Sequence, residues 1–224
     1  MGAVRALVFD FGGPVLLTPF ELLRDTERRL GLEAGVLDWS GPFDPAADPL
    51  WRSMIDGQIT ERDYWHRRAE QLHALAGTGD DVRHLFGALF DGDQTAMVRP
   101  ESHRVLQQAA ASGLTTGVLT NDLARFHPPE WIDRNEFLRD VDVIVDGSVT
   151  GALKPDPLAF ELLLDSLDLP ASQVLFTDDQ LHNVEAAARA GLNVVWFDVT
   201  SPAASAAAVA TAAGLGVHDP SPSH

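Results

Sequence analysis

The sequence predicts an α/β fold in which a doubly wound parallel sheet carries an inserted α-helical segment. Apolar strand-like runs alternate with helical patterns after residue 100, which is typical of βαβ units and of a parallel sheet covered on both faces. One further apolar run lies near the N-terminus, and the long stretch that follows it has a helical pattern with no strand alternation. A chain of 224 residues is long enough for one domain with a sizeable insertion.

The predicted elements follow in chain order. Before residue 98 they are a buried strand over 4–9, a sharp Gly-Pro loop, and helices over 20–30, 60–72 and 82–90, with a loop at 41–49. After residue 98 they are helices over 102–111, 157–167, 180–190 and 203–213, and strands over 114–119, 141–145, 174–176 and 193–197. We therefore expect a core domain of residues 1–16 and 98–200, a helical domain of residues 17–97, and a terminal helix with a mobile tail over 201–224.

The composition excludes several classes of protein. There are no cysteines, so disulfides, thiolate metal sites and cysteine nucleophiles are excluded. The net charge of −17 argues against nucleic acid as a partner, because phosphate backbones bind basic patches. No apolar run is long enough to span a membrane and the N-terminus lacks a signal-peptide pattern, so we expect a cytoplasmic protein that binds no membrane. An anionic substrate would need a locally positive site.

Polar residues stand where the predicted strands end, and ligands bind at that edge of a doubly wound sheet. They are Asp10 after the first strand, Thr120, Asn121 and Asp122 after the second, Lys154 soon after the third, and Asp178 and Asp179 after the fourth. Taken singly, each residue is more typical of a turn or of a helix N-cap. Together Asp10, Asp178 and Asp179 with Thr120 and Lys154 place three carboxylates, a hydroxyl and a lysine on one rim. Carboxylates converge stably when a cation neutralises them, and hard oxygen ligands without cysteine or histidine indicate Mg²⁺.

Lys154 is the single lysine among the sixteen lysine and arginine residues of the chain. Lysine is a compact point charge on a flexible stem, whereas arginine is a planar fork. A tight pocket that places one small cation against a phosphate oxygen would need lysine. A composition biased toward arginine could also retain one lysine by chance. The position of Lys154, after a strand-like run and before a helix, favours a functional lysine over chance.

Four segments together resemble the motifs of the haloacid dehalogenase-like hydrolase superfamily. Residues 8–16, Val-Phe-Asp-Phe-Gly-Gly-Pro-Val-Leu, are similar to its first motif. Thr120-Asn121 is similar to the second motif, Lys154-Pro155 to the third, and Asp178-Asp179 with Asn183 to the fourth. The order and the strand placement of all four match, and the resemblance covers residues 4–197. It implies a Rossmann-like core of the type found in that superfamily.

The resemblance also implies roles for these residues. Asp10 would be the nucleophile that forms an aspartyl-phosphate, and Lys154 would hold both Asp10 and a phosphate oxygen. The phosphate would be bound by the Thr120 hydroxyl and the Asn121 N–H, beside Gly12 and Gly13. Mg²⁺ would be held by Asp10, the Gly12 carbonyl and Asp179, with Asp178 bound directly or through water, while Asn183 would orient the acidic pair. The expected partner is a small phosphorylated metabolite, and the protein is expected to be a monomer or a homodimer.

The insertion lies between the first and second motifs, as in members whose helical cap closes over the active site. Trp51, Tyr64, Trp65 and Phe86 are candidates for the core of such a cap or for the wall of the substrate site, with the core favoured for any one of them. His66 and His73, in the same segment, are expected to be surface residues and not catalysts.

The chain departs from the family pattern at Gly12, where family phosphatases usually carry a second aspartate that serves as general acid and base. Pro14 also replaces a residue that is often Thr or Val. Three interpretations stay open. The protein is a Mg²⁺-dependent phosphatase whose leaving group departs unaided or is protonated by the cap; or a metal-independent 2-haloacid dehalogenase; or a catalytically silent binder of a phosphorylated ligand or a protein. The acidic pair Asp178-Asp179 favours the phosphatase, because it would repel the carboxylate substrate of a dehalogenase.

Overall fold

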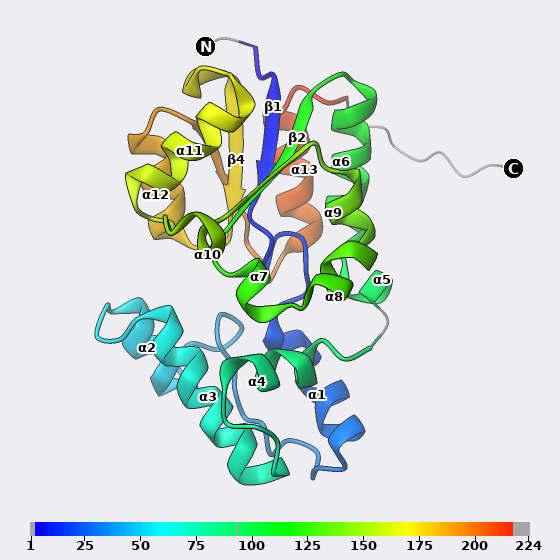
Figure 1. The fold of residues 1–224 in the computed structure, drawn as a ribbon, viewed down its shortest axis with the longest axis vertical. Coiled ribbons are helices and arrows are strands. Elements are labelled where there is room, and N and C mark those ends of the chain that lie inside the picture. Colours follow the sequence, from blue (N-terminus) through cyan, green and yellow to red (C-terminus); the bar gives the residue numbers. More distant parts are fainter. Residues whose placement is uncertain (1–2, 93, 217–224) are drawn as a thin grey trace, which may run out of the picture.

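A computed structural model describes residues 3–92 and 94–216. It has a sheet covered by helices at one end and a group of helices at the other, as Figure 1 shows. The sequence predicts a mobile tail at the C-terminal end, and residues 217–224 of it lie outside the described residues. Within the described ranges, no helix combines the length and the apolar character needed to cross a bilayer.

The sheet has five parallel strands in the order β3-β2-β1-β4-β5. Their bounds are β1 Ala6–Phe9, β2 Thr115–Thr120, β3 Val143–Asp146, β4 Val174–Asp178 and β5 Asn193–Trp196. The strand β1 is central and pairs with β2 on one side and β4 on the other. This arrangement brings the carboxyl ends of β1, β2 and β4 side by side at the edge that faces the second group of helices (Figure 1).

Both faces of the sheet are buried, so its central strand is apolar without interruption. Ala6 and Val8 of β1 pack in one hydrophobic cluster, with residues of α11 (Pro157–Leu167) and α12 (Leu181–Arg189). Leu7 and Phe9 point to the opposite face and pack in a second cluster, with residues of α6 (Pro100–Ala111) and α13 (Pro202–Ala212). The expected doubly wound parallel sheet is therefore confirmed.

Within the described residues, six short helices connect the longer elements, and the sequence pattern did not indicate them. They are α5 Gln94–Met97, α7 Leu123–Phe126, α8 Pro129–Arg134, α9 Glu136–Asp140, α10 Gly147–Thr150 and the 3-10 helix η1 Ala171–Gln173. Each is too short to display an apolar period, since about two turns are needed to define one.

The inserted segment is α-helical, with α1 Pro19–Leu30, α2 Pro49–Ile55, α3 Glu61–Ala76 and α4 Val82–Leu89. These helices lie below the carboxyl edge of the sheet in Figure 1, and we refer to them as the cap. The Thr60 hydroxyl accepts from the Asp63 N–H at 3.1 Å, and the Thr60 N–H donates to the Asp63 carboxylate at 3.0 Å, as the sequence predicts. The helix α2 was not predicted, although Asp48 as N-cap and Pro49 in its first turn are a recognised start signal.

Asp48 is the polar centre of the cap. Its carboxylate is fully buried and accepts hydrogen bonds from Arg68 at 2.5 Å, from the Tyr64 hydroxyl at 3.1 Å, and from the backbone N–H groups of Trp51 and Gly41 at 2.9 and 3.2 Å. The Arg68 guanidinium also lies over the Tyr64 ring, 4.9 Å from its centroid. One carboxylate thus links the start of α2 to the middle of α3.

The two chain segments that join the cap to the sheet domain run side by side. Leu17 N–H donates to the Met97 carbonyl at 2.8 Å, and Arg99 N–H donates to the Val15 carbonyl at 2.8 Å. The buried Arg99 side chain also donates to the Gly13 carbonyl at 2.6 Å and to the Glu21 carboxylate at 2.6 and 3.0 Å. These contacts lie where the sequence predicts the domain boundaries, between residues 16 and 17 and between residues 97 and 98. The boundaries themselves stay a prediction.

Candidate active site

Three of the residues predicted for the rim come from three adjacent strands. Asp10 follows β1 directly and its N–H donates to the Thr177 carbonyl of β4 at 2.8 Å. Thr120 is the last residue of β2 and Asp178 the last of β4, and both side chains are buried. Because β1 lies between these strands, the three residues converge at the face covered by the cap.

Lys154 lies between two of the carboxylates. Its Nζ is 2.7 Å from Asp10 Oδ1 and 2.6 Å from Asp178 Oδ2, and its side chain is 2% exposed. Burial lowers the pKa of Lys154, but the two carboxylates more than offset this and raise its pKa above the ordinary value. The ammonium group is therefore held in its charged form against Asp10.

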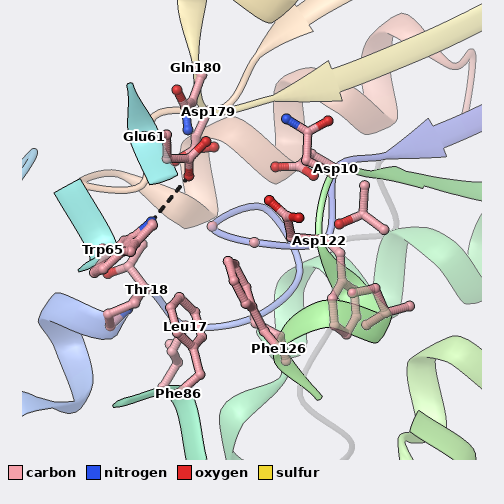
Figure 2. A pocket seen from close by; sticks show the side chains of 18 of the residues that line it. Asp10, Leu17, Thr18, Glu61, Trp65, Phe86, Asp122, Phe126, Asp179 and Gln180 are labelled. Carbon is pink, nitrogen blue, oxygen red and sulfur yellow. Dashed lines mark hydrogen bonds between the residues drawn. The ribbon is translucent and has the colours of Figure 1, made fainter. Parts of the chain in front are cut away.

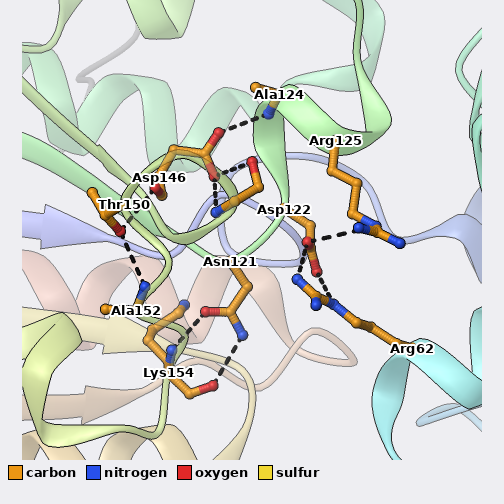
Figure 3. Close-up of polar contacts among 10 residues, drawn as sticks. Arg62, Asn121, Asp122, Ala124, Arg125, Asp146, Thr150, Ala152 and Lys154 are labelled. Atoms are coloured by element: carbon orange, nitrogen blue, oxygen red, sulfur yellow. Dashed lines mark hydrogen bonds and ion pairs between the residues drawn. The ribbon is translucent and has the colours of Figure 1, made fainter.

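The Asn121 side chain fixes the backbone of this lysine. Asn121 Oδ1 accepts from the Lys154 N–H at 2.7 Å, and Asn121 Nδ2 donates to the Lys154 carbonyl at 3.0 Å (Figure 3). The family resemblance implies a backbone role for Asn121 toward phosphate, and this side-chain contact was not foreseen. It joins the loop after β2 to the loop that carries Lys154, whose bond to Pro155 is cis.

Three carboxylates gather beside Lys154. One oxygen from each of Asp10, Asp178 and Asp179 lies within 4.8 Å of the others, a spacing that could hold a metal ion. Burial raises the pKa of Asp10 to about 7 although Lys154 opposes the shift, and Asp178 adds to it. Burial and the neighbouring Asp178 and Asp10 also raise the pKa of Asp179. A single lysine does not neutralise the group, so the arrangement favours a bound cation.

Asp178 differs from the other two carboxylates in its hydrogen bonds. Its Oδ1 accepts from the Gln180 N–H at 2.8 Å, and Asn183 Nδ2 donates to both of its oxygens at 3.1 and 3.3 Å. With Lys154 on Oδ2, both oxygens already accept hydrogen bonds. The Asn183 side chain thus fixes the orientation of Asp178 from α12.

The loop after Asp10 approaches the acidic group closely. Gly13 has φ +86°, and a Cβ at this position would lie 2.7 Å from Asp179 Oδ2. Only glycine fits there without displacing the carboxylate. Gly12 differs, because its φ lies outside the left-handed region and a Cβ would meet no atom within 4 Å.

A second group of polar contacts braces the loop after β2, as Figure 3 shows. Asp146, at the end of β3, accepts from the Ala124 N–H at 2.7 Å and from the Ser148 N–H at 2.9 Å. Asp122 pairs with Arg62 of the cap helix α3, with contacts of 2.6 and 3.3 Å. The Arg62–Asp122 pair therefore connects the cap to the sheet domain at the rim of the site.

A cavity of about 130 Å³ lies between the acidic group and the cap. Asp10, Asp122 and Asp179 lie at one end, and Leu17, Phe86 and Phe126 lie at the other (Figure 2). Of the four aromatic candidates in the cap, Trp51, Trp65 and Phe86 line this cavity, whereas Tyr64 is fully buried in the cap. His66 and His73 are exposed and do not line the cavity.

Several residues of the cavity wall were not singled out from the sequence, among them Glu61 and Phe126. Glu61, the first residue of α3, accepts from Trp65 Nε1 at 3.3 Å, and burial raises the pKa of its carboxyl. Phe126 of α7 stacks on Phe86 of α4 with ring centroids 4.2 Å apart. In the sequence, Glu61 is indistinguishable from the acidic residues that stabilise the first turn of many helices by interacting with the helix dipole. Phe126 does not belong to a periodic apolar pattern, so the sequence does not single it out.

Comparison with known proteins gives a family match over most of the chain. The family described as hydrolase, haloacid dehalogenase-like hydrolase, matches residues 4–191. Phosphatase MT3486 of Mycobacterium tuberculosis (strain CDC 1551 / Oshkosh) is 27% identical over 207 residues, which cover 88% of each chain. A phosphoglycolate phosphatase of Yersinia pseudotuberculosis serotype I (strain IP32953) is 28% identical over 196 residues, 84% of this chain and 78% of that protein.

Other matches differ in length or show the fold alone. Acyl-CoA dehydrogenase family member 10 of Mus musculus is 29% identical over 196 residues, 87% of this chain, and the chain spans only 18% of that protein. Among solved structures, the HAD-hydrolase YfnB of Bacillus subtilis, bound to magnesium, has a TM-score of 0.65 at 17% identity, covering 88% of this chain and 87% of that one. The defluorinating L-2-haloacid dehalogenase Rha0230 has a TM-score of 0.57 at 20% identity, covering 86% and 80%.

Proposed function

The chain belongs to the haloacid dehalogenase-like hydrolases, and from this premise we propose that it is a Mg²⁺-dependent phosphatase of small phosphomonoesters. The observation that carries the proposal is the group of Asp10, Asp178 and Asp179 beside one buried lysine. A site that attacks an anionic phosphate with a carboxylate needs a cation beside the nucleophile. The relatives named as phosphatases support the same reaction class.

The residues fit a magnesium ion by their chemistry. Mg²⁺ prefers hard oxygen ligands, and the three carboxylates offer oxygens within 4.8 Å of one another. Asp10 and Asp179 would bind it directly together with the Gly12 carbonyl, whereas Asp178, whose two oxygens already accept hydrogen bonds, would act through a water. When bound, the ion would offset the negative charge of the phosphate and of Asp10.

Side chains and backbone groups of the protein carry out the steps of hydrolysis. The Asp10 carboxylate attacks the phosphorus atom, the ester oxygen leaves with the bonding electrons, and an aspartyl-phosphate forms on Asp10. Lys154, fixed by Asn121 and held between Asp10 and Asp178, keeps the nucleophile in line and pairs with a phosphate oxygen. Thr120 and the Asn121 N–H hold further phosphate oxygens. A water then attacks the aspartyl-phosphate, which releases phosphate and restores Asp10.

The reaction lacks the general acid that would ordinarily stand at position 12. The first open alternative is a leaving group that departs without a proton, and the second is an acid from the cap, where Glu61 brings a carboxyl to the cavity wall. In either case residues 17–97 act as the cap that closes over the site and excludes water from it.

The test is hydrolysis of p-nitrophenyl phosphate and of a panel of phosphorylated metabolites, with Mg²⁺ and with EDTA. We expect phosphate release that requires Mg²⁺ and that falls to background in Asp10→Asn, which has the same shape without the nucleophilic carboxylate. Absence of release from every ester with Mg²⁺ would exclude the phosphatase. Chloride release from 2-chloropropionate in EDTA would then identify a dehalogenase, and the absence of both activities would identify a catalytically silent binder.

A further inference from the structure

The cavity has a single charged end. Around Asp10 its wall is polar, and Figure 2 shows Phe86 and Phe126 at the end away from Asp10. The aromatic rings that line the cavity include those of Phe20, Trp51, Trp65, Phe86 and Phe126. Trp65 and Phe86 meet edge to face at 5.3 Å between centroids. Rings held against one another in this way offer a substrate a preformed apolar surface.

Cations are almost absent from this wall. Lys154 is the only lysine or arginine among the described residues that line the cavity, and both of its carboxylate partners are already in place. His127 also lines the cavity, and burial lowers its pKa to about 4, so its ring is neutral at physiological pH. A second anionic group on a substrate would find no positive partner at the apolar end.

The charged side chains that line the cavity beside Lys154 are carboxylates, as far as the described residues show. Glu61 and Asp122 both line the cavity, and Glu61 lies beside Asp179 at its polar end (Figure 2). The two arginines beyond the rim, Arg62 and Arg125, lie 2.6 and 4.0 Å from Asp122. Burial of an unpaired carboxylate is strongly unfavourable, and carboxylates nearby make it more so.

We propose that the organic group of the substrate is small, uncharged and apolar, an aryl or short alkyl group, and that the cavity excludes phosphomonoesters with a second carboxylate. This inference rests on the proposed function, because it takes the end near Asp10 as the end that binds phosphate. The cavity volume of about 130 Å³, below the roughly 300–1,000 Å³ of sites for drug-sized ligands, sets the limit on size.

The test measures binding, so that it does not depend on turnover. Benzylphosphonate, 3-phosphonopropionamide and 3-phosphonopropionate are titrated into the protein by calorimetry with Mg²⁺ at pH 8. The amide and the carboxylate have nearly the same shape and differ in charge. We expect benzylphosphonate to bind most tightly and the carboxylate to bind at least about ten-fold more weakly than the amide, since its charge stays unpaired.

Two variants assign the effect to the cavity wall. Phe126→Ala should weaken benzylphosphonate about ten-fold and leave the amide nearly unchanged, and Phe43→Ala, in an exposed cap loop, is its control. Glu61→Gln should narrow the difference between amide and carboxylate, whereas Glu70→Gln, an exposed residue of the same helix, should not.

The outcomes separate this inference from the proposed function. Equal affinity for amide and carboxylate, no preference for benzylphosphonate, or no binding of any of the three would overturn the inference. Hydrolysis of benzyl phosphate and phosphoglycolate is measured in parallel. If the phosphonates bind in the expected order but neither ester is hydrolysed, the phosphatase proposal is wrong, and the inference that the cavity binds a small, apolar, uncharged organic group is supported.

Discussion

At the scale of single residues, Gly12 stands where family phosphatases usually carry a second aspartate that serves as general acid and base. The position has an ordinary backbone conformation, and a Cβ added there would meet no atom within 4 Å. Nothing in the local packing therefore requires glycine at position 12. In contrast, the next residue must be glycine, because a Cβ there would meet Asp179.

We predict that Gly12→Asp accelerates hydrolysis of poor leaving groups more than good ones. A general acid typically contributes about 10²–10⁴-fold in rate, and only a leaving group that needs a proton can use it. The measurement is kcat with benzyl phosphate and with p-nitrophenyl phosphate, and Gly12→Asn is the control of equal size that cannot donate an acidic proton. An equal gain on both esters would show that protonation does not limit the rate.

We predict that Lys154→Arg lowers kcat/KM by at least about 10²-fold, the usual effect of removing one group that stabilises charge in a transition state. The lysine side chain is 2% exposed and spans two carboxylates at 2.6 and 2.7 Å. A planar guanidinium is wider and would displace Asp10. Circular dichroism should show an unchanged fold. Full activity in this variant would mean that the single lysine has no special role.

The residues at the strand ends were predictable, while their partners were not. Asp10, Thr120, Asp178 and Asp179 follow strands that their own apolar runs define, so their meeting at one edge follows from a parallel sheet. The bond of Asn121 to the Lys154 backbone joins positions 33 apart in the sequence. Such a contact depends on the paths of two loops, which carry no periodic signal.

At the scale of helices and strands, the cap depends on one buried carboxylate. Burial opposes the ionisation of Asp48, but hydrogen bonds from the Trp51 N–H, Arg68, Gly41 and Tyr64 outweigh it and hold the pKa of Asp48 below its ordinary value of 3.8. A group with a lowered pKa in the folded state stabilises that state above its unfolded pKa, and the stabilisation is lost as the pH falls through the folded value.

We predict that Asp48→Ala destabilises the protein by about 3–5 kcal/mol, because it leaves the Arg68 charge buried without its partner. The measurement is urea unfolding at pH 7, followed by tryptophan fluorescence. The same unfolding repeated from pH 7 to pH 3 should show a loss of stability below about pH 4 that is smaller in the variant. Asp44→Ala, at an exposed position in the same loop, should change stability by less than about 0.5 kcal/mol. Similar losses in the two variants would exclude Asp48 as the centre of the cap.

The long elements were predictable to within a few residues because they show clear periods. The strand expected over 174–176 is observed over Val174–Asp178, and the helix expected over 82–90 is observed over Val82–Leu89. The stretch over 41–49 was expected to be a loop because glycine and proline cluster there, and the start of α2 at Pro49 was missed for the same reason. Proline favours a helix in its first turn and disfavours one in its interior, so composition alone does not separate the two.

At the scale of the whole molecule, the charge of −17 makes the entry of a phosphate unfavourable unless positive charge is concentrated at the site. Lys154 and the three carboxylates that could hold a metal ion belong to the sheet domain, while the cap supplies much of the apolar wall of the cavity. The Arg62–Asp122 pair is an ionic contact that joins the cap and the sheet domain at the rim of the cavity, with side chains 39% and 11% exposed. Its strength should therefore influence how the cap closes.

We predict that Arg62 and Asp122 act as one unit in catalysis. A partly exposed ion pair contributes about 0.2–1 kcal/mol, so Arg62→Ala and Asp122→Asn should each lower kcat/KM by up to about five-fold. The double variant should be no worse than the single ones, because either change already breaks the contact. The loss should also shrink in high salt, which screens the pair in the parent protein, whereas Arg67→Ala, at an exposed position on the same helix, should have no effect at any salt concentration. Losses that add in the double variant would mean that the two side chains act separately, Asp122 on the substrate and Arg62 on the surface of the cap.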